Sequence, residues 1–498
     1  MPSCSWPRVL AFLTVYVPVW ASAFAPRPPC DAFRLRDRRA ALSCCSTKGG
    51  ATTTAAQDWT GVLPFLPPER FRSASPAESL REGEWFKLIC GASFEDLPAV
   101  RNLALVYTLA GADCIDVAAD EAVIEAARDG MLAARGVAEA IGVPLRAPWL
   151  MMSVNDDEED PHFRKAVFDP SLCPSADCPR PCESICPADA IVFPDSAAPP
   201  PQRAAMVAEL LETSAGGGVL GPRCYGCGRC IDVCPPGIIE AQKYMRSPQV
   251  IRELLEKVEA VEIHTKGNVE HFRVLWEESI AAAAEQSLRL VAVSFPDLGA
   301  GTGLTIAAMN SIMGIDGSAE EGGRGGWESM EGGGAATEGR ATRALNVWQT
   351  DGRPMSGDIG TGATTACIRL AEKVLATQVL PFGEGQHYVQ LAGGTNARTA
   401  PKLRELELIG GHPQASVEEE RVQPRQKQQH QEQRSRSKAH VGVGGVAYGG
   451  YARKAVGRAL DRLPGGPNDG GGRVEDFPEV LSAAVEEASL LLGGLKRP

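Results

Sequence analysis

Eight of the fifteen cysteines in this 498-residue chain lie between positions 173 and 234, with the spacing of metal ligands. The second four form a Cys-x2-Cys-x2-Cys-x3-Cys-Pro run, which holds iron–sulfur clusters in bacterial ferredoxins. These four are Cys224, Cys227, Cys230 and Cys234. Glycines between the first three permit a tight loop that turns thiolates and backbone N–H groups toward one cluster. The fourth cysteine of such a run ligates the neighbouring cluster.

The first four cysteines have wider gaps but the same ending, x3-Cys-Pro. They are Cys173, Cys178, Cys182 and Cys186. Pairing the two halves predicts one cluster on Cys173, Cys178, Cys182 and Cys234, and a second on Cys224, Cys227, Cys230 and Cys186. We expect two 4Fe–4S clusters, with a 3Fe–4S cluster as the alternative in the first quartet. Zinc would favour two separate Cys-x2-Cys pairs, and a disulfide scaffold would be a shorter chain with scattered cysteines.

The body of the chain alternates predicted strands and helices from Glu84 onward. The expected strands are 87–93, 114–120, 148–155, 260–265, 288–295, 345–350, 387–391 and 441–447. The expected helices are 97–110, 122–141, 248–258, 269–287, 304–313, 364–377, 401–406 and 451–463. Eight such units predict a closed parallel (βα)8 barrel, with an open doubly wound α/β sheet as the alternative. Cys90, Cys114 and Cys367 fall inside these elements and are expected to be core residues.

These elements define the expected domains. The barrel covers 84–160 and 245–463, and the ferredoxin-like module at 161–244 is inserted after the third strand. A C-terminal helix is expected over 474–495. Segments 316–340 and 414–440 are rich in Gly, Glu, Gln and Arg without an apolar period, so we expect disordered insertions.

The N-terminus has the pattern of a two-part targeting leader. Residues 1–23 contain a short apolar stretch and an Ala-Ser-Ala cleavage site, as in a signal peptide. Residues 24–57 are rich in Arg, Ser and Ala and poor in acids, as in a transit segment. The junction resembles leaders of algae with secondary plastids, so the expected location is the plastid stroma. Simple secretion is the alternative, although it suits the reduced thiols poorly.

Five further segments are long and specific: Lys87–Ser93, Leu109–Asp120, Asp160–Lys165, Trp348–Asp358 and Gln390–Asn396. They resemble the cyanobacterial light-dependent period proteins, the LdpA family, and the resemblance runs from about 85 to 460. It implies an iron–sulfur protein that couples light-dependent redox state to circadian period. An electron donor or acceptor and a signalling protein would then be its partners.

Polar residues that alternate with apolar ones along the strands point into the barrel. Asp116 and Glu262 belong to this set, either as a satisfied network or as part of a site. Asp120, His264 and Asp351 are nearer the carboxyl ends of their strands, where barrel enzymes place catalytic groups, and they are the catalytic candidates.

Glycine-containing loops follow the last two strands, where barrels often bind phosphate. They contain Gly393, Gly394 and Thr395 after the seventh strand, and Gly449 and Gly450 after the eighth. They keep an alternative function open, an FMN-dependent oxidoreductase fed by the two clusters. The favoured function is an iron–sulfur redox sensor or electron-transfer protein.

Charge and hydropathy exclude two other classes. Lys and Arg total 50 against 62 Asp and Glu, a net charge of −12, which argues against a nucleic-acid binder. Beyond the leader there is no run of about 20 apolar residues, so no stable membrane span is expected.

Overall fold

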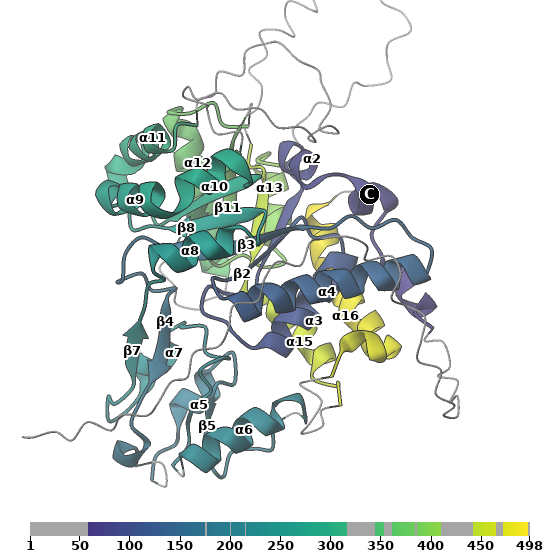
Figure 1. Cartoon of the computed structure of the whole chain (residues 1–498), viewed down its shortest axis with the longest axis vertical. Coiled ribbons are helices and arrows are strands. Elements are labelled where there is room, and N and C mark those ends of the chain that lie inside the picture. The colour runs from purple at the N-terminus through teal and green to yellow at the C-terminus, as the bar shows by residue number, and fades with distance from the viewer. Residues whose placement is uncertain are drawn as a thin grey trace, which may run out of the picture. The chain divides into compact units, whose positions relative to one another are not determined.

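Eight parallel strands close into a barrel in the computed structural model of this chain (Figure 1). The structure describes residues 58–174, 177–199, 201–214, 216–315, 344–352, 361–383, 386–409, 442–464 and 472–496. The strands pair around the barrel in the order β1-β12-β11-β10-β9-β8-β3-β2. They are β1 (Trp85–Ile89), β2 (Cys114–Ala118), β3 (Trp149–Asn155), β8 (Ala260–His264), β9 (Leu290–Phe295), β10 (Leu345–Asp351), β11 (His387–Ala392) and β12 (Gly445–Tyr448). The closed parallel barrel confirms the predicted fold class, and the open sheet is excluded.

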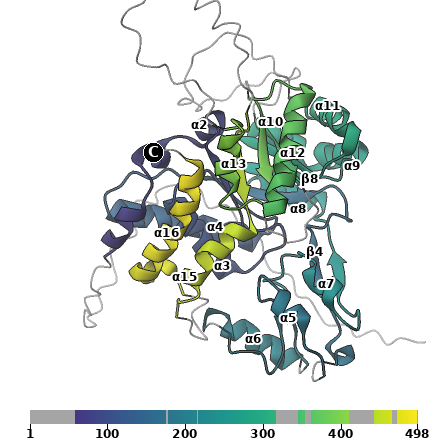
Figure 2. The same ribbon diagram turned by 180° about the vertical axis from the view of Figure 1, so that it is seen from behind.

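Helices follow the strands and cover the outside of the barrel (Figures 1 and 2). They are α3 (Leu97–Leu109), α4 (Glu121–Ala140), α8 (Pro248–Leu255), α9 (Val269–Leu275), α10 (Ala281–Gln286), α11 (Thr302–Met313), α12 (Thr361–Thr377), α13 (Thr399–Glu405) and α15 (Gly450–Leu460). The single helix expected over 269–287 is divided, because a π-helical turn at Trp276–Ile280 separates α9 from α10. A short 3-10 turn, Gly299–Gly301, precedes α11.

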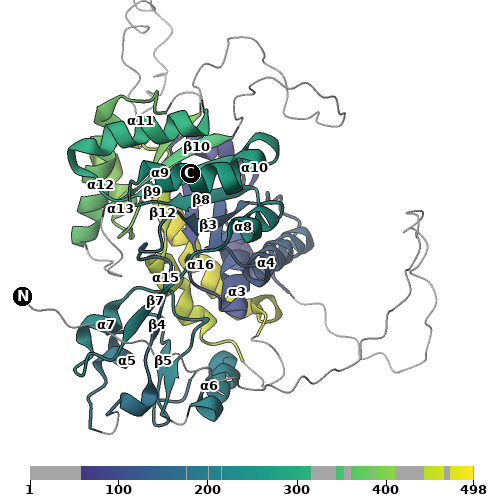
Figure 3. The ribbon, with the colours of Figure 1, turned by 60° about the vertical axis from the view of Figure 1, so that its left-hand side comes forward.

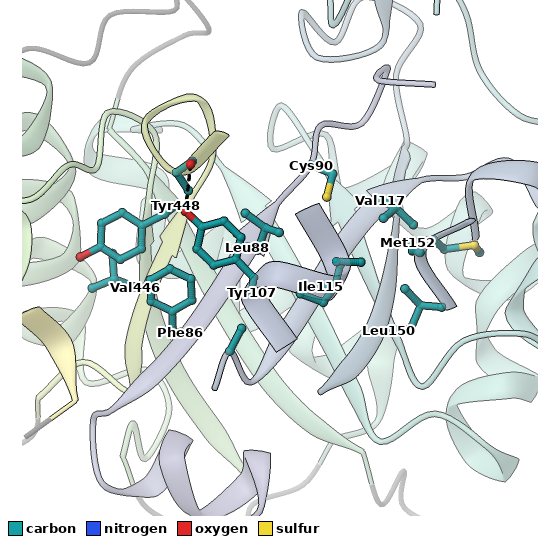
Figure 4. Packing of buried hydrophobic residues seen from close by; sticks show 14 of the residues in the cluster. Phe86, Leu88, Cys90, Tyr107, Ile115, Val117, Leu150, Met152, Val446 and Tyr448 are labelled. Atoms are coloured by element: carbon teal, nitrogen blue, oxygen red, sulfur yellow. Dashed lines mark hydrogen bonds between the residues drawn. The ribbon is translucent and has the colours of Figure 1, made fainter. Parts of the chain in front are cut away.

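The main hydrophobic core lies between the barrel and these helices. Phe86 on β1 stacks on Tyr448 of β12, with ring centroids 4.9 Å apart, and on Tyr107 of α3 at 5.8 Å (Figure 4). The buried Tyr107 hydroxyl donates a hydrogen bond to the Ala452 carbonyl at 2.8 Å. Cys90, Cys114 and Cys367 are buried, as expected of core residues.

Segments before β1 and after α15 pack against the same barrel. Ahead of β1 lie a 3-10 turn (Thr60–Phe65), α1 (Glu69–Ser73) and α2 (Pro76–Arg81). The C-terminal segment has a 3-10 turn (Val474–Asp476) and then α16 (Pro478–Leu495), whose buried face joins the main core. Beyond α16, buried Lys496 forms an ion pair with Asp113 at 2.8 Å.

The segment between β3 and α8 is an insertion with its own small sheets (Figure 3). Its elements are β4 (Arg164–Val167), a 3-10 turn (Pro170–Leu172), α5 (Pro181–Ile185), β5 (Ile191–Val192), α6 (Pro201–Thr213), β6 (Gly218–Val219), α7 (Arg229–Val233) and β7 (Glu240–Lys243). β4 pairs with β7, and β5 pairs with β6, both antiparallel. The first strand of the insertion therefore pairs with the last, which brings its two cysteine runs together.

The barrel interior changes from apolar to polar along its axis. At the amino ends of the strands, Trp85, Trp149, Met151 and Tyr388 belong to a separate buried apolar cluster. Toward the carboxyl ends the same faces carry charged and amide side chains, all buried. The C-terminal mouth is therefore the polar end of the barrel.

Several predicted segments lie outside the described residues: the leader parts 1–23 and 24–57, and the insertions 316–340 and 414–440. Within the ranges that are described, no helix is both long enough and apolar enough to cross a membrane.

Candidate functional site

The two cysteine runs fold into matching local structures. The short helices α5 and α7 each begin after a residue in the left-handed region, Arg180 with φ 51° and Gly228 with φ 79°. Each ends at a cysteine with nearly the same dihedral angles, Cys186 at φ −70°, ψ 111° and Cys234 at φ −71°, ψ 112°. A proline follows both cysteines and stops the helix. The insertion is therefore built as two similar halves.

Four thiols drawn from both halves lie near one another in the first group. Burial raises the pKa of Cys173, and the nearby thiols of Cys178 and Cys234 raise it further. Burial also raises the pKa of Cys182, and the nearby thiols of Cys234 and Cys173 raise it further. A hydrogen bond from the backbone N–H of Glu183 lowers the same pKa in part. The structure thus brings Cys234 to the three cysteines of the other run.

The second group lines a single small cavity, with Cys186 beside Cys224, Cys227 and Cys230. Burial and the three neighbouring thiols raise the pKa of Cys230 to about 12. Such crowding is unfavourable for four thiolates unless a cation shares them. Each group therefore contains three cysteines from one run and the last cysteine of the other.

Backbone amides point at several of the sulfur atoms. The Ala166 N–H donates to the Cys224 sulfur at 3.3 Å, and the Arg180 N–H donates to the Cys178 sulfur at 3.4 Å. The Ala190 N–H donates to the Cys186 sulfur at 3.2 Å. Hydrogen bonds of this kind stabilise thiolates and tune the reduction potential of a cluster.

The loop of the second run needs glycine at a precise point. Gly226 has φ 73°, and a Cβ atom there would collide with the carbonyl oxygen of Arg164 on β4. The Arg164 Nε in turn donates to the Gly226 carbonyl at 2.8 Å. This contact fixes the cysteine loop against the first strand of the insertion.

A cavity of about 600 Å³ lies between the C-terminal mouth of the barrel and the insertion. Cys186 and Tyr225 line it from the insertion, and His162, His264 and Asp351 line it from the mouth. The residues of both predicted phosphate loops line it as well: Gly393, Gly394, Thr395, Gly449 and Gly450. One end of the second cysteine group therefore borders the same space as His264 and Asp351.

The glycine loops differ in how open they are. Gly393 has φ 68°, and a Cβ atom there would collide with the Asp351 carboxylate, so this glycine is required by close packing. Cβ atoms at Gly449 and Gly450 would meet nothing closer than 3.7 and 3.8 Å. The Thr395 hydroxyl donates to the Ala447 carbonyl at 2.6 Å. The loop before α15 is thus the more open of the two.

Below the cavity, a buried ion-pair network fills the polar end of the barrel. Lys87 is fully buried and pairs with Asp116 at 3.2 Å and with Glu262. Burial opposes the charge on Lys87, but Asp116 and Glu262 outweigh it and raise the lysine pKa. Ser153 donates to Asp116 at 2.8 Å, and Gln349 donates to Glu262 at 2.6 Å. For Asp116 and Glu262 the structure therefore shows the satisfied network.

His264 and Asp351 are joined at the mouth by a residue that the sequence did not single out. His162 lies just before β4, with its Nε2 3.3 Å from Asp351 and its Nδ1 3.0 Å from Asp160. Its ring centroid is 4.7 Å from that of His264. Burial opposes a charge on His162, but the hydrogen bonds to Asp160 and Asp351 raise its pKa to about 10. No local pattern marks His162 as a site residue, because only the fold brings it to Asp351 and His264.

Asp120 lies apart from these groups. β2 ends at Ala118, and the Asp120 carboxylate accepts hydrogen bonds from the backbone N–H groups of Ala122 and Val123 at the start of α4. It is not among the residues that line the cavity. Its position is that of a helix cap, which accounts for an acid at this place in the chain.

The fold and the site define an α/β barrel that carries an eight-cysteine insertion at its C-terminal mouth. Residues 173–245 match the family model of the LdpA Fe-S cluster-binding domain, and residues 254–493 match that of the light dependent period A C-terminal domain. A relative from Synechococcus elongatus, "Light dependent period A", is 40% identical over 425 residues, which cover 85% of this chain and 94% of the relative. The chain belongs to the LdpA family and is an iron–sulfur protein.

Among solved structures, a tryptophan synthase from Mycobacterium tuberculosis aligns with 82% of this chain and 96% of its own. The identity is 10% and the TM-score is 0.29.

The ion-pair network gives a first prediction. Lys87→Met leaves Asp116 and Glu262 buried without their cation, so we expect the free energy of unfolding to fall by about 3–5 kcal/mol. Urea unfolding followed by tryptophan fluorescence measures this. The control is Lys266→Met, because Lys266 is 45% exposed and its ion pair with Asp157 spans 3.6 Å. This substitution should change the free energy of unfolding by no more than about 0.5 kcal/mol. Equal losses in both variants would contradict the network's role.

Proposed function

We propose that the chain binds two iron–sulfur clusters, one on Cys173, Cys178, Cys182 and Cys234, and one on Cys186, Cys224, Cys227 and Cys230. The observation that carries this proposal is the shared cavity of the second group, to which Cys186 contributes from the other run. The second cluster is of the 4Fe–4S type. The first quartet, with its wider spacing, holds a 4Fe–4S or a 3Fe–4S cluster.

The clusters serve redox sensing or electron transfer, and they couple light-dependent redox state to signalling through a protein partner. Contacts between the insertion and the barrel support a sensing role. Arg223 of the insertion pairs with Asp96 at 2.6 Å, and Arg453 of α15 lies 4.0 Å over the ring of Tyr225 in the cysteine loop. Arg453 also donates to the Cys90 carbonyl at 2.6 Å. An added electron changes the charge beside these cationic contacts, which provides a route from cluster to barrel.

The second candidate function is an FMN-dependent oxidoreductase fed by the clusters. It is favoured by the cavity that joins Cys186 to the glycine loops and to His264 and Asp351. The two functions differ in an observable way, because a flavoenzyme retains FMN and its visible bands after the clusters are removed. In that case Gly394→Val would abolish FMN retention, since Gly394 has φ 91° and borders the cavity.

The ligand sets give a second prediction, which concerns the cluster that Cys234 binds. Cys234→Ser should remove the low-temperature spin signal of the first cluster and leave that of the second, although Cys234 belongs to the second run. Cys227→Ser and Cys186→Ser should both remove the second signal. Electron paramagnetic resonance of the oxidised and of the chemically reduced protein measures these losses, together with iron per chain. Cys173→Ser should have a milder effect if the first cluster has three irons.

The matched control is Cys367→Ala, a buried cysteine on α12 outside the insertion, which should keep both signals. Loss of the same signal in Cys234→Ser and Cys227→Ser would show that each run holds its own cluster. Unchanged iron content in Cys227→Ser would overturn the assignment.

We also propose that the chain acts in the plastid stroma of an alga with a secondary plastid. The support is the two-part composition of residues 1–57. A fluorescent reporter fused behind residues 1–57 should accumulate in the plastid of such an alga. A reporter behind residues 1–23 alone serves as the control and should enter the secretory route only. Secretion of both reporters would contradict the proposal.

A further inference from the structure

One group of side chains at the barrel mouth belongs to neither cysteine quartet. Asp160, His162 and His264 each offer one ligand atom, and these atoms all lie within 4.8 Å of one another. His264 ends β8, whereas Asp160 and His162 lie in the segment that leaves β3 and begins the insertion. Phe163 holds this arrangement, because its ring meets that of His264 edge-on with centroids 5.3 Å apart.

In both histidines the Nε2 atom faces a carboxylate that is not itself a member of the group. His264 Nε2 lies 2.9 Å from the Glu262 carboxylate, and His162 Nε2 lies 3.3 Å from Asp351. Metal-binding histidines usually donate their second ring N–H to a carboxylate in this way, which orients the ring and raises its basicity. This orientation assigns Nδ1 of each histidine to the ion, and Nδ1 of His162 faces Asp160, the third member of the group.

The distance between His162 Nδ1 and Asp160 Oδ1 is 3.0 Å. Two ligands each about 2.1 Å from one ion are about 3.0 Å apart when they subtend a right angle at it. The same spacing suits a hydrogen bond from a protonated His162. A metal ion and a proton would thus compete for this position, and metal binding would release the proton.

The charges around the group favour a cation. Asp160, Asp351, Glu262 and Asp116 are all buried, and Lys87 pairs with the last two. One lysine cannot neutralise both of its carboxylate partners, and a protonated His162 would neutralise only one of Asp160 and Asp351. A divalent ion beside His162 and His264 would offset the remaining negative charge, as buried carboxylates require.

We propose that Asp160, His162 and His264 bind a divalent transition-metal ion, with Asp351 and Glu262 as the positioning residues for the two histidines. Two imidazoles and a carboxylate suit Zn²⁺, Fe²⁺ and Mn²⁺. Because His162 and His264 line the 600 Å³ cavity, the other coordination positions of the ion face that space. Sites with such open positions are typical of catalysis rather than of structural support. The proposal stands on barrel-mouth residues and is independent of the cluster assignment.

Mn²⁺ is a suitable probe, because it prefers oxygen and nitrogen ligands and leaves thiolates to the iron. We expect the cluster-loaded full chain to bind one Mn²⁺, seen as loss of the six-line resonance of free Mn²⁺, and to release it to Zn²⁺. Asp160→Asn and His264→Ala should abolish this binding. Asp351→Asn keeps all three ligands and should weaken it about 10- to 100-fold.

The matched control is His271→Ala. His271 lies on α9 at the same end of the barrel, with 51% of its side chain exposed. This variant should bind Mn²⁺ like the wild type. The visible absorption of the clusters must stay unchanged in each variant, which reports that the chain is folded. Failure of the wild type to bind either Mn²⁺ or Zn²⁺, or equal binding by Asp160→Asn, would overturn the proposal. Neither result would affect the cluster assignment, which is read from the spin signals.

Discussion

The common direction of the eight strands determines where everything else in this protein can lie. In a closed parallel barrel all carboxyl ends meet at one mouth, and the helices return the chain to the opposite end. The insertion leaves the end of β3 and returns before α8, so it must both begin and end at that mouth. The antiparallel pairing of β4 with β7 then closes the insertion on itself. Its cysteines are thereby held at the face where barrels carry out chemistry.

The same constraint explains why the polar residues gather at one end. The amino-terminal half of the interior is filled by bulky residues such as Trp85 and Trp149, packed edge to face at 5.7 Å. The other half contains Lys87 between Asp116 and Glu262, an arrangement that costs desolvation energy and gains little stability over an apolar core. Buried charges of this kind are retained where they orient other groups, and here Glu262 holds His264. The network therefore connects the interior of the barrel to its mouth.

Features encoded by local spacing could be predicted from the sequence, whereas features that depend on the return path of the chain could not. The Cys-x2-Cys run and the strand–helix alternation are local, and both the barrel and the iron–sulfur family follow from them. Asp120 caps α4 and lies outside the strand, because β2 ends two residues earlier than its apolar pattern suggested. Lys87 lies two residues after Trp85 on β1 and therefore shares its face of the strand. The alternation of apolar and polar residues gives no sign that this lysine pairs with two buried acids. His162 meets Asp351 only because the segment after β3 reaches the end of β10, which no local pattern encodes.

We propose that an iron–sulfur cluster held by both cysteine runs borders the cavity at the barrel mouth. Anomalous diffraction at the iron edge, from crystals grown without oxygen, tests it most directly. We expect two iron clusters within the insertion, one of them bonded to Cys186 together with Cys224, Cys227 and Cys230 and adjoining the cavity. Iron bonded to Cys234 together with Cys224, Cys227 and Cys230, with Cys186 left free, would contradict it.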